Sequence, residues 1–82
     1  PVLKVGFTGA LRSSVNGHAQ VDAQASTIRE LLSGLVQRYP DLAEHVEQGI
    51  AVALDGEIYR DDWSKSIPDG STVFLLPRIQ GG

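Results

Sequence analysis

Three short segments of the chain alternate between hydrophobic and polar or small residues with a period of two. They are residues 2–7, 50–54 and 71–76. Successive side chains of a β-strand point to opposite faces, so this pattern is typical of strands that bury one face. The side chains expected to face inward are Leu3, Val5, Phe7, Ile50, Val52, Leu54, Val73 and Leu75.

Two weaker segments, residues 18–23 and 57–59, complete the set of predicted strands. Residues 57–59 follow Asp55-Gly56, a dipeptide that favours a type I′ turn because both central residues need a positive φ. The turn therefore joins residues 50–54 and 57–59 into a hairpin.

Residues 27–39 carry the clearest helical pattern. Thr27 and Glu30 are spaced as in a capping box, in which each side chain accepts a hydrogen bond from a free backbone N–H of the first turn. Pro40 cannot continue the helix. One apolar stripe follows the 3.6-residue period: Ile28, Leu31, Leu32, Leu35, Val36 and Tyr39. A helix with one apolar stripe must pack on another element, and in this chain that element can only be a sheet.

The remaining segments are polar and contain many turn-forming residues. Residues 8–17 are rich in Ser, Asn, Gly and Thr and are predicted to form a loop, as are residues 61–70. Residues 41–48 are predicted to form a short second helical turn that buries Leu42 and Val46. The order of elements predicts an α+β roll, with one main helix on one face of a mixed sheet of four to five strands.

Composition excludes several classes of function. Eighty-two residues allow one small domain, and ten acidic against seven basic residues argue against binding to nucleic acid or to a membrane surface. The absence of cysteine excludes disulfides, thiolate metal sites and a cysteine nucleophile. His18 and His45 lack partners at ligand spacing, so no metal site is expected. We expect a soluble, cytoplasmic protein that is not an enzyme by itself.

The informative chemistry lies at the end of the sequence. Pro77 closes the last strand, so the domain is expected to comprise residues 1–77 and a flexible tail residues 78–82. Gly81 and Gly82 have no Cβ, and such an arm fits a narrow tunnel. Its only reactive group is the α-carboxylate of Gly82. The alternative is an ordinary frayed terminus.

Three segments carry a family pattern: residues 27–32 (TIRELL) with Tyr39-Pro40, residues 52–56 (VALDG) and residues 67–82 (IPDGSTVFLLPRIQGG). Together they resemble the ubiquitin-like sulfur carriers, which are small β-grasp proteins of the thiamin-synthesis (ThiS) and molybdopterin-synthesis (MoaD) type. The resemblance covers nearly the whole chain and implies the β-grasp (ubiquitin-like) fold.

The resemblance also implies a carrier cycle. A partner of the ubiquitin-activating type would adenylate Gly82 with ATP and magnesium, and a sulfur donor would displace AMP to leave a C-terminal thiocarboxylate. That group would supply sulfur to an acceptor enzyme in a biosynthetic pathway. The chain itself would bind no cofactor and would be a protein substrate.

Three other functions remain open at this point. The chain is alternatively a ubiquitin-like modifier that forms an isopeptide bond between Gly82 and a target lysine. It is alternatively the small subunit of a complex similar to molybdopterin synthase. The third alternative is a noncatalytic interaction domain in which the Gly-Gly end is incidental.

A partner-docking face is expected on the side of the sheet away from the helix. The strand periodicity places Ala51 and Ala53 there, beside two larger side chains that lead into the tail. The residues expected to bind partners are Phe74, Leu76, Arg78, Ile79 and Gln80. The alternatives are that Phe74 and Leu76 pack against loop residues, and that Arg78 is merely solvated.

Overall fold

The computed structural model describes residues 2–60 and 62–77, without the side chain of Ala10. Within these residues, one mixed sheet has the strand order β2-β1-β5-β3-β4. The β1–β5 pair is parallel and the other three pairs are antiparallel. The strands are β1 (Leu3–Phe7), β2 (Gln20–Ala23), β3 (Ile50–Leu54), β4 (Glu57–Tyr59) and β5 (Thr72–Pro77).

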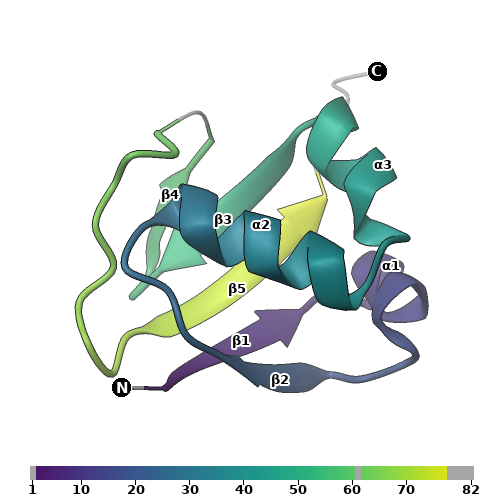
Figure 1. Ribbon diagram of the computed structural model, residues 1–82, viewed down its shortest axis with the longest axis horizontal. Coiled ribbons are helices and arrows are strands. Elements are labelled where there is room, and N and C mark those ends of the chain that lie inside the picture. The colour runs from purple at the N-terminus through teal and green to yellow at the C-terminus, as the bar shows by residue number, and fades with distance from the viewer. Residues whose placement is uncertain (1, 61, 78–82) are drawn as a thin grey trace.

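The main helix, α2 (Ile28–Arg38), crosses one face of this sheet (Figure 1). The shorter α3 (Leu42–Gln48) follows it and contacts both α2 and β3. The predicted α+β roll with one main helix on a mixed sheet is therefore confirmed. Figure 1 also shows that α2 leaves the opposite face of the sheet uncovered.

The hydrophobic core lies between α2 and the sheet. The predicted inward positions of β1, β3 and β5 are all buried, and so is the stripe of α2 as far as Leu35. Val36 and Tyr39 are partly buried against the edge of this core. The alternation in the strands and the 3.6-residue period in the helix thus identify the two surfaces that meet.

The N-terminus of α2 begins as the sequence predicts. Thr27 has extended backbone angles, and its Oγ1 accepts a hydrogen bond from the N–H of Glu30 at 3.2 Å. The Glu30 carboxylate accepts from the N–H of Ser26 at 3.4 Å, one residue earlier than in the usual capping box. The helix ends at Arg38, before Tyr39 and Pro40.

Replacement of Thr27 by alanine is expected to lower the free energy of unfolding by about 1 kcal/mol, because the N–H of Glu30 loses its side-chain acceptor. Thermal unfolding monitored by circular dichroism measures this as a decrease of about 4–8 °C in Tm. Ser33→Ala, in the exposed middle of the same helix, is the control and is expected to cause no loss. Equal Tm values for the wild type and Thr27→Ala would mean that the cap contributes nothing.

The turn between β3 and β4 also agrees with the prediction. Asp55 and Gly56 have φ values of 49° and 91°, as a type I′ turn requires. The Asp55 carboxylate accepts a hydrogen bond from the N–H of Thr72 at 2.9 Å. This contact ties the hairpin to the start of β5.

The predicted loop at residues 8–17 is wrong. The segment forms the helix α1 (Gly9–Arg12) and the 3-10 helix η1 (Ser13–Val15). Leu11 and Val15 are both 0% exposed and belong to the core cluster. Two apolar side chains four residues apart fill one end of the core, and this packing outweighs the low helix propensity of Ser and Gly.

Candidate functional site

The uncovered face of the sheet carries an apolar patch, built by the strand register. Phe74 of β5 lies opposite Ala53 of β3, and Ala53 lies opposite Ile58 of β4. One pleat further along, Leu76 of β5 lies opposite Ala51 of β3. We call these five residues the docking patch: Ala51, Ala53, Ile58, Phe74 and Leu76.

The two largest side chains of the docking patch are open to solvent. Phe74 is 48% exposed and Ile58 is 56% exposed, whereas their neighbours Val73 and Leu75 are fully buried on the helix side. Leu76 is partly buried. The prediction that Phe74 faces away from the helix is therefore confirmed, and an exposed apolar patch of this kind is typical of a protein-binding surface.

The Phe74 ring packs against the backbone of β1. Gly6 is its partner in the parallel β1–β5 pair. A methyl group at Gly6 would lie 2.6 Å from Cδ1 of the Phe74 ring and closer still to Cε1. The missing Cβ therefore lets the ring lie over β1.

Replacement of Gly6 by alanine is expected to displace the Phe74 ring and to weaken partner binding by about three- to tenfold, with little change in stability. Calorimetric titration with a partner protein that binds the docking patch measures the change in Kd. The control is a double-mutant cycle, in which Gly6→Ala has no further effect in a Phe74→Ala background. If Gly6→Ala lowers the affinity equally in the wild-type and Phe74→Ala proteins, Gly6 acts independently of Phe74.

Ile58 is a docking-patch residue that was not predicted from the sequence. The signal was present, because the two-residue turn at Asp55-Gly56 fixes the register of β4 against β3 and places Ile58 opposite Ala53. Lys4 is a second outer-face residue that was omitted. It lies opposite Thr72 of β5 and Asp22 of β2, and adds a positive charge beyond the apolar side chains.

The predicted tail continues from the end of β5. Leu76 and Pro77 are the last two described residues of that strand, so the described part of the chain ends directly beside the docking patch. The other predicted site residues, Arg78, Ile79, Gln80, Gly81 and Gly82, lie outside the described residues. Their assignment, and the boundary between domain and tail, remain predictions.

Among the described residues, no group of three or more His, Asp or Glu side chains is placed to hold a metal ion. His45 Nε2 lies 3.1 Å from Ser14 Oγ. Within the same residues, none of the helices has the length and apolar character that crossing a membrane requires.

Among the residues that the structure describes, one side chain has a shifted pKa, and it lies on the helix side of the sheet. The Tyr59 hydroxyl donates a hydrogen bond to the Glu57 carboxylate at 2.6 Å. This bond, together with the negative charges of Glu57 and Asp62, raises the pKa of Tyr59 above its ordinary value of 10.0. Tyr59 lies opposite the buried Val52, so it is not part of the docking patch.

Comparisons with solved structures find the same fold in several proteins. The complex of BexX and CysO from Amycolatopsis orientalis matches with 23% identity and a TM-score of 0.78, over 98% of this chain and 99% of that chain. SAMP1 from Haloferax volcanii matches with 19% identity and a TM-score of 0.76, over the whole of both chains. A complex of subunits 1 and 2 of the molybdopterin-converting factor from Helicobacter pylori matches with 24% identity and a TM-score of 0.70, also over both whole chains.

A comparison with curated protein sequences finds no match. The model of the ThiS family, in contrast, matches residues 5–82, which is nearly the whole sequence. This match confirms the resemblance inferred from the three sequence segments. The chain therefore belongs to the ThiS family, within the wider group of ubiquitin-like sulfur carriers and modifiers.

Proposed function

We propose that the protein is a sulfur carrier that reacts through the α-carboxylate of Gly82 when this residue is the chain terminus. The observation that carries the proposal is the family match, which extends from β1 through the Gly-Gly sequence at residues 81–82. A partner enzyme of the ubiquitin-activating type would bind ATP and Mg²⁺. A biosynthetic acceptor enzyme in the cytoplasm would receive the sulfur.

The proposed chemistry has two steps. A carboxylate oxygen of Gly82 attacks the α-phosphorus of ATP, which forms an acyl-adenylate and releases pyrophosphate. The sulfur of a hydrosulfide-equivalent donor then attacks the acyl carbon, and AMP leaves with the bonding electrons, so that a thiocarboxylate remains. The first step replaces a poor leaving group by a good one, while Mg²⁺ and cationic groups of the partner stabilise the phosphoryl charge.

The docking patch supplies the recognition surface in this proposal. Phe74 and Leu76 lie on β5, so a partner that covers them is also placed where the chain continues toward the tail. Arg78, Ile79 and Gln80 would then bridge from the patch to the reacting residue. Burial of an exposed aromatic side chain at the centre of such an interface contributes a large share of binding energy.

A second candidate function is protein modification through Gly82. It is favoured by the match to SAMP1 from Haloferax volcanii, because two further matches, one from Methanosarcina acetivorans, are described as small archaeal modifier protein 1. A stable subunit of a molybdopterin-synthase-like complex is the third, in view of the two-subunit structure from Helicobacter pylori. Activation of the terminal carboxylate is the first step of the modifier reaction as well.

Intact-mass spectrometry separates these functions. The protein is incubated with ATP, its cognate activating enzyme and sulfide. Replacement of one terminal oxygen by sulfur supports the carrier, whereas transfer from the adenylate to lysine but never to sulfide supports the modifier. If a demonstrably active partner causes no ATP-dependent change in mass, the proposed activation is wrong.

A further inference from the structure

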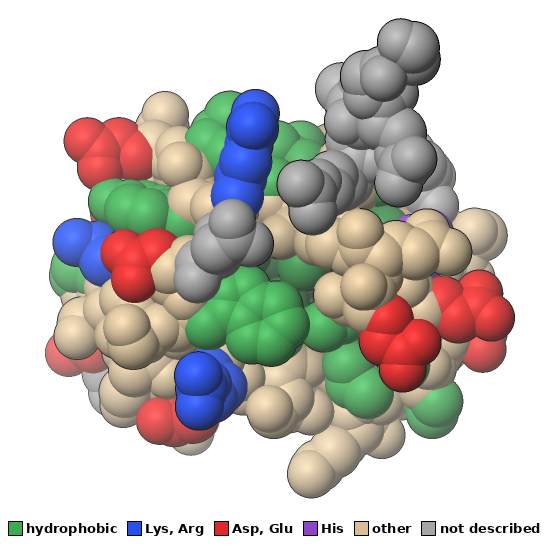
Figure 2. Space-filling view, turned by 90° about the horizontal axis from the view of Figure 1, so that it is seen from above, with side chains coloured by type: hydrophobic (Ala, Val, Ile, Leu, Met, Phe, Trp, Pro, Cys, Tyr) green, Lys and Arg blue, Asp and Glu red, His purple; other side chains and the backbone are tan. Residues whose placement is uncertain are grey.

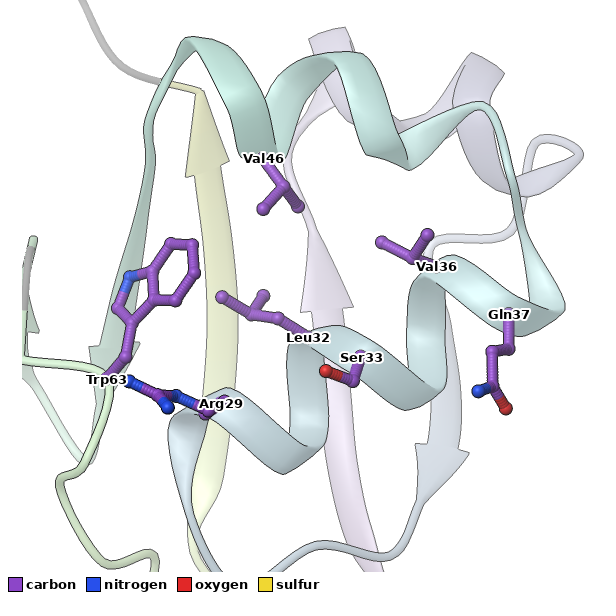
Figure 3. A pocket seen from close by; sticks show the side chains of 7 residues that line it. All are labelled: Arg29, Leu32, Ser33, Val36, Gln37, Val46 and Trp63. Atoms are coloured by element: carbon purple, nitrogen blue, oxygen red, sulfur yellow. The ribbon is translucent and has the colours of Figure 1, made fainter.

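A groove lies on the helix side of the molecule, away from the docking patch. It runs between α2, α3 and the segment at residues 62–66, and has a volume of about 340 Å³ (Figure 3). Seven side chains line it: Arg29, Leu32, Ser33, Val36, Gln37, Val46 and Trp63. We call it the helix-side groove.

The floor of the helix-side groove is apolar. Leu32 is only 3% exposed, whereas the other three apolar lining residues, Val36, Val46 and Trp63, are partly buried. Figure 3 shows the indole of Trp63 and the side chains of Val46 and Leu32 converging on one space. Seen from above, the molecule has hydrophobic side chains gathered in a central hollow (Figure 2).

One end of the helix-side groove is cationic. The exposed Arg29 side chain extends toward Trp63, and Ser33 and Gln37 follow it along α2 (Figure 3). Figure 2 shows Lys or Arg side chains close to the hydrophobic hollow. A positive charge at one end of an apolar groove favours an acidic ligand, even though the net charge of the protein is −3.

Backbone hydrogen bonds hold the groove open in a fixed shape. The N–H of Arg29 donates to the carbonyl of Trp63 at 2.9 Å, and the N–H of Ile28 donates to that of Lys65 at 3.1 Å. These N–H groups belong to the first turn of α2 and have no partner within the helix. The contacts therefore fix Trp63 against α2, and a fixed site loses less entropy when it binds a ligand.

We propose that the helix-side groove binds a short extended segment of a partner protein that carries a bulky apolar side chain next to a carboxylate. The apolar side chain would lie over Leu32 and Val46 against the face of Trp63, and the carboxylate would pair with the guanidinium of Arg29. From Arg29 to Gln37, α2 rises by about 12 Å, which matches three to four residues of extended chain.

Binding at the helix-side groove leaves the docking patch uncovered. The docking patch is on the uncovered face of the sheet, whereas the groove is formed by the helices on the other face (Figure 1). A protein held at the groove would therefore leave Phe74 available to another partner. The inference adds a second binding surface and does not depend on the chemistry of Gly82.

Peptide display on the intact 82-residue protein tests the inference. Selected peptides are titrated against the fluorescence of Trp63, the only tryptophan of the chain. We expect the peptides to combine apolar and acidic residues, to change the Trp63 emission, and to bind at least about tenfold more weakly to Arg29→Glu. An acidic residue is favourable in the first turn of a helix, so Arg29→Glu is expected to fold normally.

The matched control is Arg12→Glu, which makes the same change of charge at an exposed position on α1 and is expected to bind like the wild type. The inference is overturned if the peptides lack acidic residues, if they bind Arg29→Glu as well as the wild type, or if Phe74→Asp and not Arg29→Glu abolishes binding.

Sedimentation of the protein alone adds a further test. Self-association that Arg29→Glu abolishes would assign the groove to a second copy of the chain.

Discussion

Deletion of Gly82, or extension of the chain by one residue beyond it, is expected to reduce adenylation more than about a hundredfold while the fold remains intact. The deletion moves the terminal carboxylate back by about 3.5 Å. This shift is as large as the distance between the reacting atoms in a productive complex, which is about 3–3.5 Å. The extension converts the Gly82 carboxylate into an amide. In the proposed reaction, neither variant would present a carboxylate oxygen where the partner would hold the α-phosphorus of ATP.

Release of pyrophosphate in the presence of the cognate activating enzyme measures this loss. Within the described part of the chain every buried core residue lies between Leu3 and Leu75, so both variants are expected to have the Tm of the wild type. Arg12→Ala, at an exposed position on α1, keeps the Gly-Gly end and its carboxylate, and as the control it is expected to retain most of the activity. Adenylation of both Gly82 variants at the wild-type rate would contradict the tail as the reacting segment.

The parts of the fold that the sequence predicted depend on contacts that are local in the chain. The helix α2 begins at Thr27, where the capping residue and its acceptor are three residues apart. The turn at Asp55-Gly56 depends on the backbone angles of two adjacent residues. Such features are encoded within a few residues, so periodicity and turn chemistry are enough to find them.

The parts that the sequence did not predict depend on packing between distant segments. Leu11 and Val15 form helical turns because two apolar side chains are needed to fill one end of the core. The polar residues around them in the sequence hide this pattern. The contact between Phe74 and Gly6 exists only once β1 and β5 are paired in parallel. Trp63 packs against the edge of the core, and the groove beside it requires Val46 of α3 as well. Tertiary structure supplies these contacts, and short sequence patterns do not.

Replacement of Phe74 by aspartate is expected to raise the Kd for the activating enzyme at least about 30-fold, which corresponds to the loss of about 2 kcal/mol typical of a binding hot spot. The substitution removes the largest exposed ring of the docking patch. It also requires the partner to cover a carboxylate that lies between Gly6 and Ala53, neither of which provides a side chain to pair with it. The expected loss of stability is smaller, about 1 kcal/mol, because nearly half of Phe74 is already exposed.

Thr72→Asp is the matched control for this variant. It places the same charge on the same face of β5, two residues earlier and opposite Lys4, where the positive charge compensates it. If the docking patch is the recognition surface, calorimetric titration will show a large increase in Kd for Phe74→Asp and a small one for Thr72→Asp. Equal effects of both variants would mean that charge on the sheet, and not the apolar ring, governs binding. A collapse of Tm for Phe74→Asp would instead make Phe74 a structural residue, and recognition would then rest on the tail and on the rest of the patch.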